Sequence, residues 1–473
     1  MNLKFITSKI CLFSIVILFL SLFIFGRNSF GFLYFLGNTF AILTSMGLLL
    51  YTSNRISLFS TKIFYRKLFF SSFIFRTFPI IIIYFILQSM SSGDIGIEEY
   101  DTVFYDSFAR YLANYYKSGL FNADVKSFLE FEFDDKGYIF ILSFVYFLFD
   151  NLLFAKIVQG LFDTFSVLLI YKIARKIYNE QIARIAGILS SVFLPFIVIS
   201  SLHTKEVYMT FFLLLSIYYT IKINNHQYNF KNFLVLFLSI IALFSMRLIL
   251  GIIVLISILY YLFVNQNRSY FAKIILPIII LFTFFGTLKY INADDQIMEK
   301  LGGYLGYENS EEIMIGGRSA EEIERGGQGY AKYASYLLLL PQVIITPYPS
   351  IVRTNIKMYN TTMQWFFAGG LFIWSYLSFF AFIGIYQTLK FNFKKTSIVT
   401  IILSLYILVV VYSFYITSIR FNIPKLVLLI FFTAVGINHK FINKNKYFLI
   451  YVIFISIIIL SWNYIKLAGR GMV

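Results

Sequence analysis

Residues 6–26 read ITSKICLFSIVILFLSLFIFG, a run of apolar side chains with a single charge, Lys9. A helix of this length crosses the hydrocarbon core of a bilayer. Runs of about 17–25 apolar residues, the length a membrane helix needs, recur to the end of the chain. The 473 residues are 59% hydrophobic and 13% charged, with a mean hydropathy of +0.77. A soluble domain carries about twice that charged fraction, so the sequence predicts an all-α polytopic membrane protein.

The first apolar run has basic residues at its start, Lys4 and Lys9, as a secretory signal peptide does. It lacks a small-residue cleavage site, and further apolar runs follow it, so we expect a retained anchor. Cys11 is the only cysteine of the chain, which excludes an internal disulfide framework and a CxxC metal site.

Hydropathy predicts thirteen transmembrane helices. They are expected near residues 6–26, 31–52, 68–90, 152–172, 182–200, 206–222, 231–247, 249–265, 272–289, 363–388, 396–416, 420–438 and 445–463. With the N-terminus in the cytoplasm, every inner loop is basic, as the positive-inside rule requires. The formal charge of +17 is therefore explained by membrane orientation, and no nucleic-acid partner is expected.

The acidic residues are gathered in the two long loops of the chain. Residues 91–136 and 290–362 together hold 19 of the 23 acids, and both loops are predicted to be extracytoplasmic. Functional residues concentrate on such loops. The chain is divided accordingly into N-terminal spans (1–90), a first extracytoplasmic loop with interfacial helices (91–151), a central transmembrane bundle (152–289), a second extracytoplasmic loop (290–362) and a C-terminal transmembrane bundle (363–473).

Two short helices are predicted in the first loop, near 101–117 and 138–149. In the first of them, Phe104, Phe108, Tyr111, Leu112 and Tyr115 are expected to form one apolar face. The second is short for a span. If it crossed the bilayer, the basic segment YKIARKIYNEQIAR would move outside, so we expect it to lie on the outer face.

A few ionisable residues fall at the outer ends of predicted spans. They are His203, Lys205, Glu206, Arg247 and Arg420. A charge at this depth is costly unless it is paired or functional. Snorkelling, or Lys–Glu pairs that join helix ends, would also explain these residues. A single histidine without a second His or Cys nearby gives no ground for a metal site, and none is predicted.

The chain has no P-loop, GxGxxG, HExxH or GxSxG motif in a useful context. Nucleotide-driven transport and zinc hydrolysis are therefore unsupported. The carboxylates, lysines and arginines that remain suit general-base chemistry on a hydroxyl, with cations holding a phosphate leaving group.

A series of short motifs then gives a family resemblance. The first loop contains D-x3-Y-x3-A (Asp101, Tyr105, Ala109), followed by DDKGYIFILSFVYFLFDN and by AKIVQGLFDTFSVLLIYKIARKIYNEQIARIAGILSSVFLP. In this order the motifs resemble the lipid-dependent glycosyltransferases of the GT-C superfamily, such as protein mannosyltransferases and the aminoarabinose transferase of lipid A. The resemblance covers about residues 90–210, and a weaker similarity is found at RFNIPKL.

The resemblance implies roles for particular residues. Asp101 matches the catalytic acid, and Asp135 with Lys136 matches the acid–Lys pair near the lipid phosphate, so Asp101 and Asp135 are the candidate catalytic carboxylates. The chain departs from the family where Gly137 and Tyr138 replace two prolines. Three predicted spans precede the acidic loop where the family usually has one, and this extra span pair preserves orientation.

The implied reaction transfers a sugar from a polyprenyl phosphate to an acceptor hydroxyl, that of a glycan or a lipid in cell-envelope synthesis. Asp101 would accept the hydroxyl proton, with inversion at the sugar. Cations would stabilise the departing phosphate. The candidate substrate-binding residues are Tyr105, Lys136, His203, Lys205, Glu206, Arg247, Arg318, Arg353 and Arg420. The clustered acids could hold a divalent cation, but they show no fixed ligand spacing.

The expected location is the bacterial cytoplasmic (inner) membrane, with the active site on the extracytoplasmic side. Two alternatives stay open. A Wzy-type polysaccharide polymerase also acts on lipid-linked sugars and would centre on Arg318 and Arg353. A lipid-linked oligosaccharide flippase or other transporter expects charges lining both halves of the protein, whereas these acids lie almost entirely on one side.

Overall fold

Helices are the only regular elements in the part of the chain that the computed structural model describes. That part comprises residues 3–25, 32–56, 59–90, 100–119, 133–225, 229–264, 343–345, 349, 358–391, 393–412, 419–440 and 442–468. The helices are α1 (Leu3–Phe25), α2 (Phe32–Ile56), α3 (Thr61–Met90), α4 (Tyr100–Lys117), α6 (Phe133–Leu148), α7 (Leu152–Ile177), α8 (Glu180–Val192), α9 (Leu194–Ser201), α10 (Glu206–Asn224), α11 (Phe230–Met246), α12 (Leu248–Val264), α18 (Met358–Phe391), α19 (Phe393–Tyr412), α20 (Ile419–Asn438) and α21 (Lys444–Ala468). The predicted all-α class is confirmed for these ranges.

Eight described helices are long and apolar enough to cross a membrane. They are Phe35–Thr52, Thr61–Phe85, Leu152–Ile177, Glu206–Asn224, Gly369–Phe391, Phe393–Val410, Phe421–Asn438 and Lys444–Tyr464, each at a predicted span. Three other predicted spans are shorter apolar helices, Ile6–Ser21, Phe230–Met246 and Leu248–Val264. The predicted span 272–289 lies outside the described residues. The multi-pass architecture is confirmed, and the total of thirteen spans stays a prediction.

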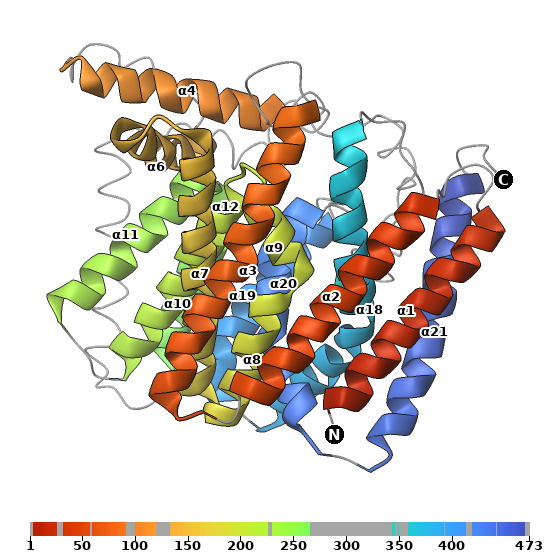
Figure 1. Cartoon of the computed structure of the whole chain (residues 1–473). Coiled ribbons are helices and arrows are strands. Elements are labelled where there is room, and N and C mark those ends of the chain that lie inside the picture. Colours follow the sequence, from red (N-terminus) through yellow and green to blue (C-terminus); the bar gives the residue numbers. More distant parts are fainter. Residues whose placement is uncertain are drawn as a thin grey trace, which may run out of the picture.

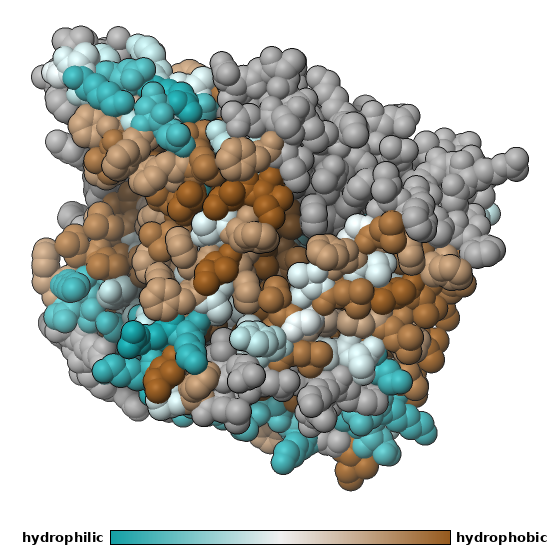
Figure 2. All heavy atoms as spheres, viewed as in Figure 1, coloured by the Kyte–Doolittle hydropathy of each residue, from teal (hydrophilic) through white to brown (hydrophobic). Residues whose placement is uncertain are grey.

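Helix α4 lies across one end of the bundle, with α6 beneath it, and the N-terminus lies at the opposite end (Figure 1). These are called the outer end and the inner end, after the predicted orientation. Apolar side chains cover the flank of the bundle between hydrophilic side chains near its two ends (Figure 2). This distribution is the one a bilayer selects.

The two helices predicted in the first loop are present. The predicted 101–117 helix is α4, and the predicted 138–149 helix is α6, which begins earlier, at Phe133. The predicted apolar face of α4 was wrong in part, because Tyr111 is 57% exposed while Tyr105 and Ala109 are buried. The buried face is rotated because α4 packs a polar side chain, Asp106, inward along with its apolar ones. That α6 does not cross the membrane stays a prediction.

Helices α18 and α20 touch through their backbones. A Cβ added to Gly384 would lie 1.8 Å from the carbonyl oxygen of Phe432, and one added to Gly436 would lie 1.9 Å from that of Phe380. Small residues permit this close approach between membrane helices, where packing replaces the hydrophobic effect as the main attraction. Only glycine fits at either position.

The predicted span 182–200 is broken in the structure. Helices α8 and α9 meet at an angle of 47°, and Pro195 stands in the first turn of α9. A break inside a bilayer leaves backbone carbonyls without their helical donors, which is tolerated only where the protein satisfies them. The hydropathy of the segment gives no sign of the break because both halves are apolar.

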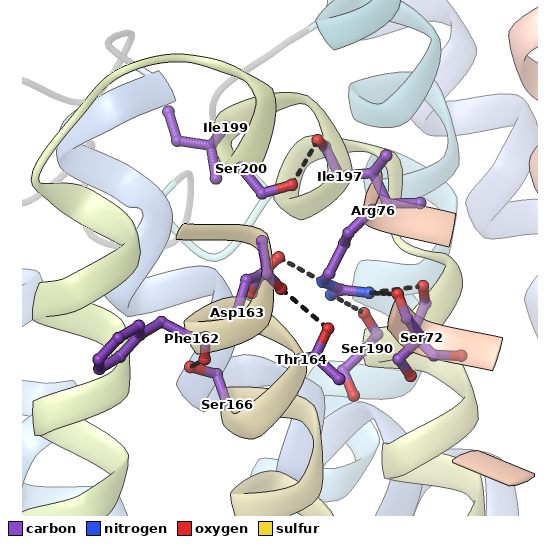
Figure 3. Close-up of polar contacts among 12 residues, drawn as sticks. Ser72, Arg76, Phe162, Asp163, Thr164, Ser166, Ser190, Ile197, Ile199 and Ser200 are labelled. Carbon is purple, nitrogen blue, oxygen red and sulfur yellow. Dashed lines mark hydrogen bonds and ion pairs between the residues drawn. The ribbon is translucent and has the colours of Figure 1, made fainter. Parts of the chain in front are cut away.

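Arg76 of α3 supplies donors at this break (Figure 3). Its side chain is fully buried, and its terminal nitrogens donate to the carbonyls of Ser191 at 3.1 Å and Ser190 at 3.2 Å. Its Nε bonds Asp163 of α7 at 2.5 Å. The Ser45 hydroxyl of α2 donates to the next carbonyl, that of Val192, at 3.0 Å. The broken span therefore receives donors from two neighbouring helices, α3 and α2, and α7 holds Arg76 in place through Asp163.

We expect Arg76→Leu to be strongly destabilising. It leaves Asp163 as a buried charge without its guanidinium and removes the donors to two carbonyls, and breaking a buried pair in this way costs about 3–5 kcal/mol. The double variant Arg76→Leu/Asp163→Leu should regain part of the lost stability. It has no unpaired buried carboxylate, but the carbonyls of Ser190 and Ser191 still lack a donor. Thermal unfolding of purified protein measures both, with exposed Arg66→Leu on the same helix as control. A single variant as stable as the control would contradict the assigned role.

The α18–α20 contact predicts that Gly384→Ala and Gly436→Ala each lower stability by about 1–3 kcal/mol, because the added methyl must push the helices apart. Gly47→Ala in α2 is the matched control, since nothing lies within 4 Å of its added Cβ. Thermal unfolding of the three variants side by side is the measurement. Equal melting temperatures for all three would show that the helices separate at no cost.

Candidate functional site

A buried carboxylate, Asp106, joins three segments at the outer end. It lies on the inward face of α4 and is 3% exposed. It accepts a hydrogen bond from Arg110 Nε at 2.9 Å and another from the hydroxyl of Tyr146 on α6. His203 Nε2, in the loop between α9 and α10, lies 3.7 Å from Asp106 Oδ1. The carboxylate thus links α4 to α6 and lies beside the loop that leads into the next span.

The charge of Asp106 is balanced by arginine and not by histidine. Burial, with Lys156 and Arg110 nearby, lowers the pKa of His203 to about 3, so its ring is neutral at neutral pH. Arg110 also pairs with Asp150 and lies over the Tyr146 ring, with Cζ 4.3 Å from the ring centroid. Burial and the adjacent Asp106 raise the pKa of Tyr146, which keeps its hydroxyl protonated as a donor.

An aromatic cluster lies beside this carboxylate. The fully buried ring of Tyr138 is 5.2 Å from Tyr105, 5.5 Å from Tyr208 and 6.0 Å from His203, measured between ring centroids. Within the described residues the Tyr138 hydroxyl has no hydrogen-bond partner. Burial, and more weakly Tyr208, Tyr146, Glu206 and Tyr105, raises the pKa of Tyr138 well above its usual value, so the hydroxyl stays protonated. It is a buried polar group available to a ligand.

The start of α6 is pressed against the end of α11. A Cβ on Gly137 would lie 2.1 Å from Ser245 Oγ, so a larger residue would have to displace that side chain and glycine permits the close approach. This accounts physically for the departure from the proline that the resemblance leads one to expect here. Lys136, one residue earlier, is 8% exposed and is held close to the α11–α12 junction by the same contact.

A second group of polar side chains lies where the α11–α12 junction approaches α19 and α20. Arg247, at the junction of α11 and α12, has Cζ 4.3 Å above the ring of Phe421. The Tyr406 hydroxyl donates to the carbonyl of Phe421 at 2.7 Å. Arg247 and Glu206 both interact electrostatically with Tyr406. Glu206 also interacts electrostatically with Tyr138, so it is within electrostatic range of both groups.

Residues near the end of the second long loop are held by the C-terminal helices. Lys425 of α20 is fully buried, and its Nζ donates to the carbonyl of Val343 at 2.6 Å. Trp374 of α18 donates to the carbonyl of Ile344 at 3.1 Å, and Asn463 of α21 donates to that of Pro349 at 3.1 Å. The C-terminal bundle thus fixes this segment beside α20.

A polar stripe on α7 holds the loop that carries His203. Lys156 Nζ donates to the carbonyl of Ser201 at 3.2 Å, and Gln159 Nε2 reaches the carbonyls of Ser200 at 3.3 Å and Leu202. These are carbonyls at the end of α9, which has no further helical donors. Asp163 follows on the same face of α7, because positions three, four and seven apart align on a helix.

The sequence-predicted residues fall into two groups. Tyr105, Lys136, His203, Lys205, Glu206 and Arg247 are buried or half-buried at the outer end. Asp101, Asp135 and Arg420 lie within α4, α6 and α20, but their side chains are outside the described part, and Arg318 and Arg353 are wholly outside it.

Sequence reasoning missed Asp106, Lys156 and Lys425. Asp106 follows Tyr105 of the D-x3-Y-x3-A motif and stands four residues before Arg110, a spacing that favours an ion pair on a helix. Lys425 is in the quoted RFNIPKL segment. Lys156 belongs to the polar stripe of α7, a repeat visible in the sequence.

The chemistry of the site is that of carboxylates, phenols and cations. No group of three His, Cys, Asp or Glu side chains that could hold a metal ion is found among the described residues. Most acids of the two long loops are outside those residues, and the side chains described here suit proton transfer and anion binding.

Residues 137–289 match the family model of the dolichyl-phosphate-mannose-protein mannosyltransferases. The matched segment begins at Gly137 in α6 and includes His203, Glu206 and Arg247, whereas α4 with Asp101 precedes it. No curated protein matches the chain. The family match bears out the resemblance seen in the motifs and indicates a membrane glycosyltransferase of the GT-C type.

Proposed function

We propose that this glycosyltransferase moves a sugar from a polyprenyl-phosphate-linked donor to an acceptor hydroxyl at the outer end of the bundle. The observation that carries the proposal is the burial of ionisable groups at this end: Asp106, Lys136, His203, Lys205 and Glu206 are each less than 9% exposed. Such groups at membrane depth are expensive and mark functional sites. A lipid-linked donor is the substrate class of the matched family, as its name states for dolichyl phosphate mannose.

Asp101 is the proposed general base. It stands one helical turn before Tyr105, whose ring packs on Tyr138 in the aromatic cluster. In the proposed step the acceptor oxygen attacks the anomeric carbon and its proton passes to the carboxylate. The bond from that carbon to the phosphate oxygen breaks, and both electrons leave with the phosphate. Attack from the face opposite the phosphate inverts the anomeric carbon.

Cations at the outer end would stabilise the leaving phosphate. Lys136 and Arg247 are both close to the α11–α12 junction, because Gly137 contacts Ser245 at the end of α11. Arginine offers a bidentate fork to a phosphate, and lysine a compact charge. Asp135, adjacent to Lys136, is the second candidate carboxylate and would orient that lysine or replace Asp101 as base.

The proposed location is the bacterial cytoplasmic membrane, with the outer end facing away from the cytoplasm. The acceptor would be a glycan or lipid of the cell envelope. The family match does not favour the polymerase or the transporter. The reaction class is tested by incubating the purified protein with a panel of polyprenyl-phosphate sugars and an acceptor. The quantity measured is the polyprenyl phosphate released.

Asp101→Asn should reduce turnover by at least about a hundredfold while donor binding persists. The amide preserves shape and hydrogen bonding but cannot accept the proton, and general-base help is worth on the order of 10²–10⁴ in rate. Donor binding is measured separately by titration with the polyprenyl-phosphate sugar.

Asp124→Asn is the matched control, since it removes an acid from the same loop at a position outside α4 in the sequence. If Asp101 only caps α4, Asn serves nearly as well as Asp and the variant should be almost silent. Full activity of a correctly inserted Asp101→Asn protein would refute the base and move the role to Asp135, Glu98 or Glu99.

Asp106 is proposed as a positioning residue, because Arg110 and Tyr146 already occupy its carboxylate. Asp106→Asn should lower stability by about 1–3 kcal/mol through its weakened bond to a charged donor. Tyr146→Phe should have a smaller effect in the same direction. A positioning role predicts that kcat falls in both variants in parallel with the loss of stability. It also predicts that the pH profile of the rate is unchanged. A loss of the acidic limb of that profile in Asp106→Asn would instead make Asp106 the base.

A further inference from the structure

Three lysines converge on one tyrosine at the inner end of the bundle, away from the proposed active site. The Nζ atoms of Lys172, Lys176 and Lys222 lie 6.0, 5.7 and 5.1 Å from the ring centroid of Tyr218. Lys172 and Lys176 come from the end of α7, and Lys222 with Tyr218 from the end of α10. All four side chains are partly buried. Lys176 and Lys222 are close enough to repel each other.

Two more tyrosines complete this group. Lys172 Nζ lies 5.0 Å from the ring centroid of Tyr65 on α3, and Lys222 Nζ lies 5.0 Å from that of Tyr219. We call the six residues the basic–aromatic cluster: Tyr65, Lys172, Lys176, Tyr218, Tyr219 and Lys222. Each ring offers its face to a cation, which holds the ammonium groups near one another without neutralising them.

No carboxylate neutralises these lysines in the part of the chain that the structure describes. Four acids lie outside the two long loops, and Asp150, Asp163 and Glu206 belong to the outer end or the bundle interior. The fourth, Glu180, accepts from Arg184 Nε at 2.8 Å and lies 3.1 Å from Arg175 Nε. Glu180 is therefore taken up by Arg175 and Arg184, and no ion pair to the clustered lysines is found among the described residues.

The positive-inside rule explains basic residues at this end, but not their convergence. Charges that only orient a helix have no need to converge or to be partly buried, and Lys390, Lys394 and Lys395 at the same end are exposed. Three partly buried ammonium groups around one ring repel each other, and an anion between them would offset that cost.

The surface next to the cluster is apolar and aromatic. On α3, Phe69 follows Tyr65 by one turn and stacks on Phe73, with ring planes 3° apart. Phe165 of α7, which is 38% exposed, packs against Phe69 at 6.0 Å. Phe165 stands two turns before Lys172, on the same face of the helix. An anionic head at the lysines would therefore carry its chains along this wall, at the depth of the acyl region.

We propose that the basic–aromatic cluster binds the phosphate headgroup of an anionic phospholipid from the inner leaflet. The site lies at the ends of membrane-spanning helices, where lipid phosphates are found and tyrosine is enriched. Basic sites between transmembrane helices on this side of the membrane are suited to acidic headgroups. The apolar wall favours a lipid over a soluble phosphate. The site is independent of the proposed glycosyl transfer.

The test is a titration of the detergent-purified full chain with phosphatidylglycerol, read by native mass spectrometry as the population carrying one bound lipid. Lys172→Gln/Lys176→Gln/Lys222→Gln should weaken the first binding event by roughly a hundredfold, about fivefold per lysine. Lys390→Gln/Lys394→Gln/Lys395→Gln, which removes the same charge from the same end, should bind as the wild type does. Phosphatidylcholine should bind more weakly than phosphatidylglycerol to the wild type and equally to both triple variants.

Three results would overturn the proposal. Unchanged binding by the first triple variant would exclude the cluster, and equal losses in both triples would leave only a general effect of charge. Competition by millimolar inorganic phosphate as effective as that by lipid would make a soluble anion the ligand. If the first triple variant does not fold, Lys222→Gln alone should show the fivefold loss, and Lys172→Arg/Lys176→Arg/Lys222→Arg should retain binding.

Discussion

The buried bond between Arg76 and Asp163 sustains a break that the bilayer would otherwise forbid. Hydrocarbon cannot donate to the carbonyls freed between α8 and α9, so a protein donor must be present. A guanidinium provides several donors in one plane, enough for Asp163 and for the carbonyls of Ser190 and Ser191 at once. Asp163 in turn makes the buried positive charge tolerable. The main role of the pair is to supply hydrogen bonds to the backbone carbonyls of Ser190 and Ser191, since a buried ion pair by itself is weak evidence of stability.

The architecture of the outer end follows from this break. Because α9 is a separate short helix, its last carbonyls are freed at a depth where Lys156 and Gln159 of α7 reach them. The loop that follows then places His203 beside Asp106. In the polar stripe of α7, Asp163 supports the break through Arg76, whereas Lys156 and Gln159 hold the loop that carries His203. A straight span from 182 to 200 would leave the stripe facing apolar side chains.

The sequence predicted those features that depend on local composition. The eight long spans, α4 and α6 follow from runs of apolar or amphipathic residues, and loop charge was enough to assign Tyr105, His203, Glu206 and Arg247 to one end. The break, and the partners of buried charges, could not be predicted. Arg76 finds Asp163 on another helix, 87 residues along the chain, and hydropathy does not specify such pairings. Asp106 was overlooked because its importance comes from Tyr146 and His203, which are distant in sequence.

The backbone contact between α18 and α20 has a mechanical consequence. Rotation of either helix against the other would drive a carbonyl oxygen toward a Cα, so the contact restricts their relative motion. Lys425 of α20 and Trp374 of α18 donate hydrogen bonds to adjacent carbonyls, those of Val343 and Ile344. The segment that closes the second long loop is therefore held by two helices whose own movement is restricted, and Lys425 stands about three turns before Gly436 along α20.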